Sequence, residues 1–157
     1  MILSRRENHD VAKWWYGDRD WFAVDGIGQL AAFVTAGQGD VPTHLLSRYG
    51  ELQQLSDNIE SLPLRAGYEL LHNYPRPDDF IDYARRGIYA YDWMEVHMTA
   101  NRKQHYYLIA RPESPLILGE LPPQLQDSFL LVRFPGLRFT DSPSFSIREV
   151  IEDVTAA

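Results

Sequence analysis

The side chains that could do chemistry in this sequence are carboxylates, histidines and serines, because the chain contains no cysteine. Without thiols it can form no disulfide, no thiolate zinc site and no thiol nucleophile. No serine lies in the Gly-x-Ser-x-Gly setting of a nucleophile elbow. A serine triad with another spacing would show no such motif, so a serine nucleophile stays possible, as do acid–base and metal-assisted chemistry.

Two histidines could contribute to a metal site. His97 and His105 could approach each other across a predicted hairpin, with Glu95 on the same face as His97. Two imidazoles and one carboxylate could hold zinc, but the spacing matches no His-Glu-x-x-His motif. We therefore expect half-buried or surface histidines and no metal site.

Aspartates cluster twice along the chain: Asp18, Asp20 and Asp25, and then Asp78, Asp79 and Asp82. Glycosidase-like chemistry needs two carboxyl groups fixed across a cleft with separated pKa values, which adjacency in sequence neither provides nor excludes. Capping of a helix by Asp78 or Asp79 is the simpler role. The sequence thus defines no catalytic residue, and we expect a protein that is not an enzyme.

The run from Gly26 to Ala31 fits the glycine fingerprint of a dinucleotide-binding turn and follows a predicted strand. That fingerprint must open a helix whose N-terminus holds a pyrophosphate. Here the apolar run Leu30–Val34 is soon followed by Gly37 and Gly39, which leaves no room for such a helix. We therefore predict a hairpin turn, with glycines supplying positive φ, and no cofactor.

The elements that must position these residues alternate between hairpins and helices. The first hairpin joins 21–24 to 30–34, and the second joins 88–93 to 104–110 through a turn at 101–103. Apolar residues at three- and four-residue steps predict a helix over 45–62, opened by Pro42. A second, shorter helix begins at Asp78 or Asp79 and stops at Gly87.

The last part of the chain is broken by prolines into short pieces. We predict strands over 116–118, 129–134 and 137–140, with at most a helical turn over 124–127. Residues 145–157 are left open, since they fit strand or helix. Together these elements predict a single α+β domain over residues 1–157, with a mainly antiparallel sheet built from hairpins and two main helices packed on one face.

The composition is that of an ordinary globular protein, with 45% hydrophobic and 24% charged residues among 157. The net charge of −7 repels phosphate backbones and anionic membranes, so we expect neither as a partner. Residues 1–80 hold 12 acidic and seven basic side chains, a balance of −5, which makes them the favoured docking face for a basic partner. No apolar leader or membrane span is indicated, and we expect a cytoplasmic protein.

Aromatic residues are plentiful, at 13% of the chain, and most are expected in the core. Near the amino terminus, however, Trp14 and Trp15 lie among charged residues, where exposed aromatic rings could anchor a partner. Our candidate partner-binding residues are therefore Trp14, Trp15, Asp18 and Asp20.

The stretch Trp21–Pro42 combines an aromatic residue, an Asp, a glycine turn, an Ala-x-Phe strand, a Gly-x-Gly and a proline that opens a helix. Together with Ile88–Trp93, Tyr106-Tyr107 and Arg111-Pro112, it resembles small bacterial proteins, some of which look like immunity proteins of polymorphic toxin systems. This resemblance implies a non-enzymatic protein that blocks a partner toxin through a surface. The alternative is a small hydrolase or ligand-binding protein with a pocket on the sheet, using Asp25, His97 or His105.

Overall fold

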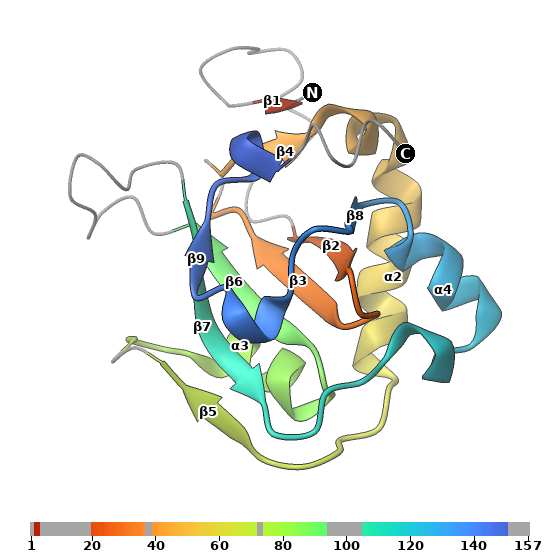
Figure 1. The fold of residues 1–157 in the computed structure, drawn as a ribbon. Helices are drawn as coiled ribbons and strands as arrows, with labels where there is room; N and C mark the ends of the chain where they lie inside the picture. Colours follow the sequence, from red (N-terminus) through yellow and green to blue (C-terminus); the bar gives the residue numbers. More distant parts are fainter. Residues whose placement is uncertain (1, 4–19, 37–38, 72–73, 94–104, 151–157) are drawn as a thin grey trace.

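The structure is a computed structural model that describes residues 2–3, 20–36, 39–71, 74–93 and 105–150 (Figure 1). Two short strands pair with each other, β1 (Ile2–Leu3) and β4 (Val41–Pro42). The main sheet contains seven strands: β2 (Asp20–Asp25), β3 (Leu30–Val34), β5 (Tyr68–Leu70), β6 (Tyr89–Trp93), β7 (Tyr106–Pro112), β8 (Arg133–Phe134) and β9 (Ser144–Phe145). Their order is β5-β7-β6-β3-β2-β8, and β9 also pairs with β7.

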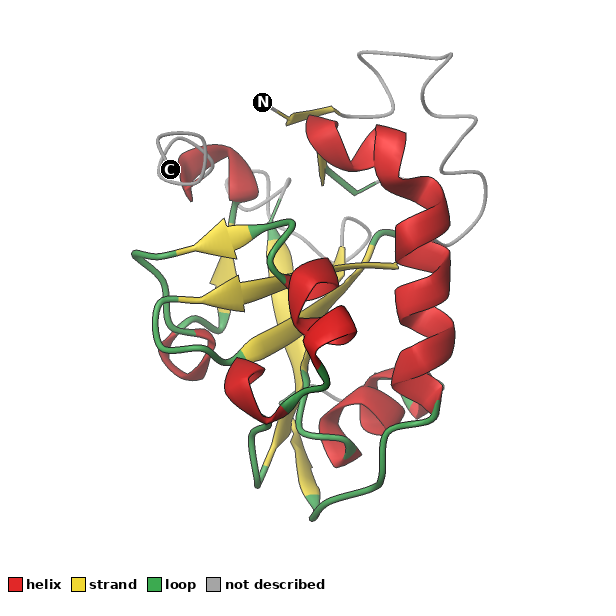
Figure 2. Ribbon diagram, turned by 90° about the vertical axis from the view of Figure 1, so that its right-hand side faces the viewer, coloured by secondary structure: helices red, strands yellow, loops and turns green. Residues whose placement is uncertain are grey.

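The helical elements lie between β4 and β6 and again after β7. They are η1 (Thr43–Arg48), α2 (Tyr49–Glu60), α3 (Asp78–Arg85), η3 (Leu118–Glu120), α4 (Pro123–Phe129) and η4 (Phe139–Asp141), where η marks a 3₁₀ helix. Among the described residues, a seven-stranded sheet and three α-helices of seven or more residues confirm the predicted α+β class. In Figure 2 the longest helix, α2, stands as a column beside the strands.

The first predicted hairpin is confirmed. β2 and β3 pair antiparallel, with Trp21 opposite Phe33. In the turn, Gly28 has a φ of +87°, which glycine adopts without the steric cost that other residues meet, whereas Gly26 does not have the positive φ that we predicted for both glycines. No helix begins there, because β3 starts at Leu30. The nucleotide-binding geometry that the glycine fingerprint suggested is therefore absent at this turn.

The second predicted hairpin is also confirmed in its strands, since β6 and β7 pair antiparallel. A register shift between Ala90 and Tyr91 introduces a bulge. The predicted turn at 101–103 lies outside the described residues.

The sheet is mostly antiparallel, but two of its pairings are parallel. β3 pairs with β6, and β2 pairs with β8. A parallel neighbour cannot be reached by a tight turn, so the chain crosses over through α2, β5 and α3 between β3 and β6. The predicted mainly antiparallel sheet is thus confirmed, but its two parallel pairings make it a mixed sheet that hairpins do not build throughout.

The long helix forms where the apolar spacing predicts it, but it begins as the 3₁₀ helix η1 directly after Pro42 and becomes α-helical at Tyr49. The short helix α3 differs from prediction at its start. Its N-cap is Pro77, and Asp78 and Asp79 lie in the first turn without a side-chain capping bond. There their charge still favours the helix dipole. Gly87, with a φ of +90°, follows the helix as predicted.

The prolines of the last third produce helical turns where we expected strands. The strand predicted over 116–118 is only a single bridge between Ile117 and Gln29, followed by η3. The helical turn predicted at 124–127 is the seven-residue helix α4, whose first residue is Pro123. The apolar run 129–134 supplies the end of α4 and only two strand residues, β8.

The run predicted as a strand over 137–140 contains the 3₁₀ helix η4 instead. Of the segment that we left open, Phe145 ends strand β9 and residues 147–150 are helical, while 151–157 lie outside the described residues. These differences share a cause, because a short apolar run is compatible with a buried strand or a buried turn of helix.

Aromatic side chains fill the core on both faces of the sheet. On one face Trp21 stacks on Phe33, which in turn stacks on Tyr91, with ring centroids 4.1 and 5.0 Å apart. On the other face, Phe22 meets Phe129 of α4 and Tyr83 of α3 edge-on. Such ring pairs contribute about 0.5–1.5 kcal/mol each beyond the area that they bury.

No helix in the described ranges is both long enough and apolar enough to cross a membrane.

Candidate functional site

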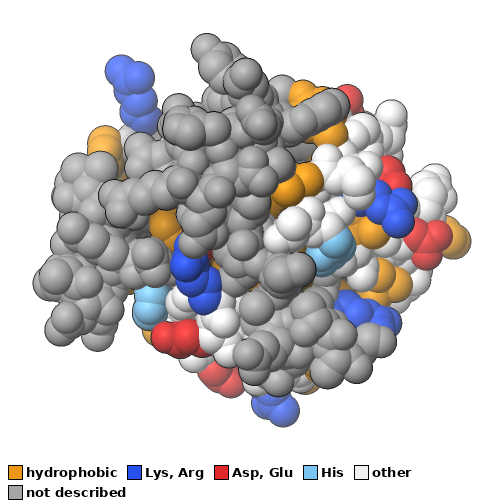
Figure 3. Space-filling model, turned by 90° about the horizontal axis from the view of Figure 1, so that it is seen from above, with side chains coloured by type: hydrophobic (Ala, Val, Ile, Leu, Met, Phe, Trp, Pro, Cys, Tyr) orange, Lys and Arg blue, Asp and Glu red, His pale blue; other side chains and the backbone are white. Residues whose placement is uncertain are grey.

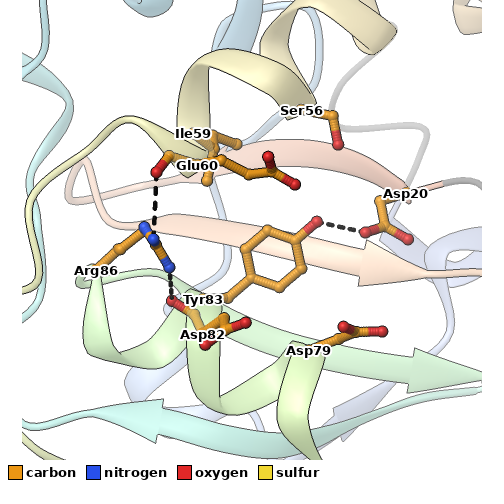
Figure 4. A pocket seen from close by; sticks show the side chains of 8 residues that line it. All are labelled: Asp20, Ser56, Ile59, Glu60, Asp79, Asp82, Tyr83 and Arg86. Carbon is orange, nitrogen blue, oxygen red and sulfur yellow. Dashed lines mark hydrogen bonds between the residues drawn. The ribbon is translucent and has the colours of Figure 1, made fainter.

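A pocket of about 460 Å³ opens between α2 and α3, over the start of β2 (Figure 4). Its size falls in the range of sites that take small ligands or side chains of a partner. Eight residues line it: Asp20, Ser56, Ile59, Glu60, Asp79, Asp82, Tyr83 and Arg86.

Helical spacing explains how these residues come together. Ser56, Ile59 and Glu60 lie three and four positions apart on α2, and therefore on one face of that helix. The four lining residues from 79 to 86 have the same spacing along α3 and just beyond its end. Asp20 comes up from the first residue of β2 to close the pocket from the sheet side.

The charge of the pocket is strongly negative. Four of its eight side chains are carboxylates, from Asp20, Glu60, Asp79 and Asp82, whereas Arg86 is the only cation among the eight. In Figure 4, Glu60 reaches over the pocket from α2, while Asp79 and Asp82 lie on the α3 side.

The guanidinium of Arg86 does not neutralise these carboxylates, because backbone carbonyls engage it. Nε donates to Leu62 O at 3.1 Å, and the Nη atoms donate to Asp82 O at 3.0 Å and Glu60 O at 3.2 Å. These bonds join the end of α2 to α3 and hold the two walls of the pocket together. Within the described ranges, no ion pair involves the side chain of Glu60, Asp79 or Asp82.

Tyr83 connects the pocket to the sheet. Its hydroxyl donates a hydrogen bond to Oδ2 of Asp20, as Figure 4 shows. Burial raises the pKa of Tyr83 well above 10.0, and the negative charge of Asp20 raises it further. The hydroxyl therefore stays protonated at neutral pH and donates to the carboxylate of Asp20.

The structure places the candidate partner-binding residues unequally. Asp20 lines the pocket, where Tyr83 holds its carboxylate. Trp14, Trp15 and Asp18 lie outside the described residues, so this prediction stays a prediction for those three.

The residues named for a metal site or a hydrolase are not brought together by the described part of the chain. His97 lies outside that part, and Nδ1 of His105 is buried without a hydrogen-bond partner within it. No three His, Asp or Glu side chains among the described residues are placed to hold a metal ion.

The carboxylate of Asp25 holds backbone segments together and does not face the pocket between α2 and α3. Its Oδ1 accepts hydrogen bonds from the backbone of Ile27 at 3.0 Å and Gln29 at 2.8 Å, and its Oδ2 accepts one from Phe139 at 2.9 Å. These bonds fix the hairpin turn and tie η4 to it. A buried carboxylate so fully engaged by backbone N–H groups is an anchor of the fold.

Most of the pocket residues were missed by sequence reasoning. Asp79 was predicted as a possible helix cap, Asp82 was noted only as part of an acidic cluster, and Glu60 and Tyr83 were not singled out. Their i, i+3, i+4 spacing does indicate one face of each helix. It does not indicate that the two faces meet each other, since that depends on tertiary packing.

On the face seen from above, the described side chains include hydrophobic, acidic and basic types, and neither charge forms a continuous patch among them (Figure 3).

Comparison with known proteins gave no match: no protein-family model, no curated protein and no solved structure is similar to this chain. The functional argument therefore depends on the pocket itself.

Proposed function

We propose that this protein is a non-enzymatic binding module whose acidic pocket between α2 and α3 takes a basic side chain of a partner protein. The observation that carries the proposal is the set of four carboxylates around one pocket, next to an arginine that is engaged by backbone carbonyls. An arginine or lysine side chain entering there would supply the missing positive charge and could form charge-assisted hydrogen bonds.

The partner that best fits this chemistry is a basic protein. A net charge of −7 on this chain would accelerate the encounter by electrostatic steering. Toxin domains that attack nucleic acids carry basic surfaces, because they must bind phosphate backbones. An immunity-like role, in which this chain blocks such a toxin, accords with the resemblance noted in the sequence.

Calorimetric titration with the protein encoded beside this chain tests the proposal. We expect 1:1 binding that weakens as salt rises, because screening reduces the attraction between opposite charges. Neutralising two pocket carboxylates in the double variant Glu60→Gln/Asp82→Asn should raise Kd by about tenfold, or about 1.4 kcal/mol.

The control variant is Asp57→Asn, which removes one exposed charge from α2 outside the pocket. It should leave Kd within about twofold, as expected for a surface charge away from the contact. Tight binding whose Kd changes neither with salt concentration nor with the double substitution would contradict the proposal.

The pocket also supports a second candidate, a binding protein for a small cationic ligand. Its volume of about 460 Å³ would accommodate a short polyamine as well as a side chain. Titration with spermidine separates the two cases. Micromolar affinity for spermidine, with no affinity for the neighbouring protein, would favour the small ligand.

A further inference from the structure

The ring of Tyr83 stands in the middle of the acidic pocket between α2 and α3. It is the only aromatic side chain among the eight that line the pocket. In Figure 4 the ring is seen broadside, with Glu60 above it on the α2 side and Asp79 and Asp82 below it on the α3 side. A ligand that enters the pocket therefore meets an aromatic surface with carboxylates on two sides of it.

The orientation of this ring is fixed by two contacts with the sheet. The Tyr83 hydroxyl donates to Asp20 of β2, and the ring meets Phe22 of the same strand with centroids 6.0 Å apart and an interplanar angle of 72°. Tyr83 is only half-buried, and part of its side chain borders the pocket. The face of an aromatic ring carries negative potential and attracts cations, more often an arginine guanidinium than a lysine ammonium.

The cation already present does not reverse the charge of the pocket. Arg86 is one positive charge among four carboxylates, which leaves a balance of −3 for the lining side chains. Hydrogen bonds to three backbone carbonyls hold its guanidinium at the ends of the two helices. Arg85, which precedes it, is exposed and does not line the pocket. The pocket thus keeps an excess of acceptor oxygens around the ring.

We infer that the pocket selects arginine over lysine and that Tyr83 determines this specificity, an inference that rests on the proposed function. A guanidinium is planar, and its N–H groups point outward in its own plane. Lying flat on the ring, it would direct these groups toward Glu60 on one side and toward Asp79 and Asp82 on the other. A lysine ammonium is a strongly hydrated point charge, which would gain the attraction of the carboxylates but not the stacking.

Two capped tripeptides, with arginine or lysine between two glycines, test the inference on ¹⁵N-labelled full-length protein. We expect the arginine peptide to bind about fivefold more tightly, which corresponds to about 1 kcal/mol. The methylene protons next to its guanidinium should shift upfield on binding, because the ring current shields a group that lies over the face of an aromatic ring. A citrulline peptide, similar in shape but uncharged, should bind about tenfold more weakly than the arginine peptide.

Substitutions at Tyr83 separate the ring from its hydroxyl. Tyr83→Phe keeps the ring and should keep the preference for arginine. Tyr83→Leu removes the ring and should bring the affinity for the arginine peptide to within about twofold of that for the lysine peptide. Thermal unfolding shows whether each variant is folded, and the upfield shift in the unaltered protein tests the stacking independently of both variants.

Equal affinity of the unaltered protein for the arginine and lysine peptides would overturn the inference and leave the proposed function standing. So would a preference for arginine that survives Tyr83→Leu or that comes without the upfield shift. Failure of both peptides to bind would contradict the proposed function together with this inference, so the two failures are distinguishable.

Discussion

The hydroxyl of Tyr83 in α3 donates a hydrogen bond to the carboxylate of Asp20 in β2, 63 residues earlier in the chain. This contact fixes the helix against the sheet and sets the floor of the acidic pocket. It also orients one of the four carboxylates, so the pocket and the packing of α3 depend on the same pair.

Removal of this hydroxyl should cost stability without disturbing the ring packing. Tyr83→Phe keeps the edge contact with Phe22 but removes the bond to a charged acceptor. We expect the free energy of unfolding to fall by about 1.5–3 kcal/mol, the usual range for a hydrogen bond to an ionised group. Urea unfolding at pH 7 measures it, and an unchanged midpoint and slope would show that the pair contributes nothing.

Alkaline pH should destabilise the protein. Burial raises the pKa of Tyr83, Tyr91 and Tyr106 well above 10.0 in the folded state. Below pH 10 both states keep these protons, so the stability is unaffected by them. Above pH 10 the unfolded chain releases protons that the folded state retains, and the free energy of unfolding falls as pH rises.

Ultraviolet titration of tyrosinate in the folded protein checks this prediction directly. Part of the tyrosine absorbance change should appear only at a pH well above 10, together with loss of near-ultraviolet circular dichroism. A titration in which every tyrosine of the folded protein ionises near pH 10 contradicts it.

Two glycine-to-alanine substitutions should have opposite effects. At Gly26 an added Cβ would lie 2.3 Å from the carbonyl oxygen of Pro135, so the hairpin turn must shift and stability should fall by about 1–3 kcal/mol. At Gly50 in α2 nothing lies within 4 Å, and alanine should add about 1 kcal/mol through helix propensity. Thermal melting of the two variants measures the difference, and equal melting temperatures would refute the account of the turn.

The buried carboxylate of Asp25 should contribute more to the stability of the fold than the exposed carboxylate of Asp141 in η4. The carboxylate of Asp25 accepts three hydrogen bonds from backbone N–H groups. In Asp25→Asn, an NH₂ group replaces one acceptor oxygen and cannot accept its bond, so the free energy of unfolding should fall by about 2–3 kcal/mol. Asp141→Asn, at an exposed position of η4, should change stability by less than about 0.5 kcal/mol. Chemical denaturation compares them, and equal losses would show that Asp25 is not an anchor.

The sequence predicts the local elements well where its patterns are long or have a defined turn. The Asp25–Gly28 turn defines the first hairpin, and the apolar spacing of Leu52, Leu55 and Ile59 defines the buried face of α2. The run around Phe129 was predicted as a strand but ends a helix, since its apolar residues are buried in either conformation. Nothing local indicates that β3 pairs with β6, because parallel pairing is decided between segments far apart.

The residues of the pocket could also be predicted only in part from local sequence patterns. The acidic excess of residues 1–80 led us to predict Asp20 as a partner-binding residue, and Asp20 does line the pocket. Glu60 and Asp82 come from α2 and α3, and Arg86 connects the ends of these two helices through backbone carbonyls. That contact depends on the crossover between β3 and β6, which no spacing in the sequence reveals.

The central claim, that the acidic pocket receives a basic side chain of the partner, is tested most directly by a matched pair of variants in α3. Asp78 and Asp79 both lie in the first turn of α3, but only Asp79 lines the pocket. Each substitution to Asn removes one charge from the same helix end, so their effects on the helix itself should be alike. We predict that Asp79→Asn raises the Kd for the partner protein by about fivefold, or about 1 kcal/mol, while Asp78→Asn leaves it unchanged. Equal affinities of the two variants would contradict the account.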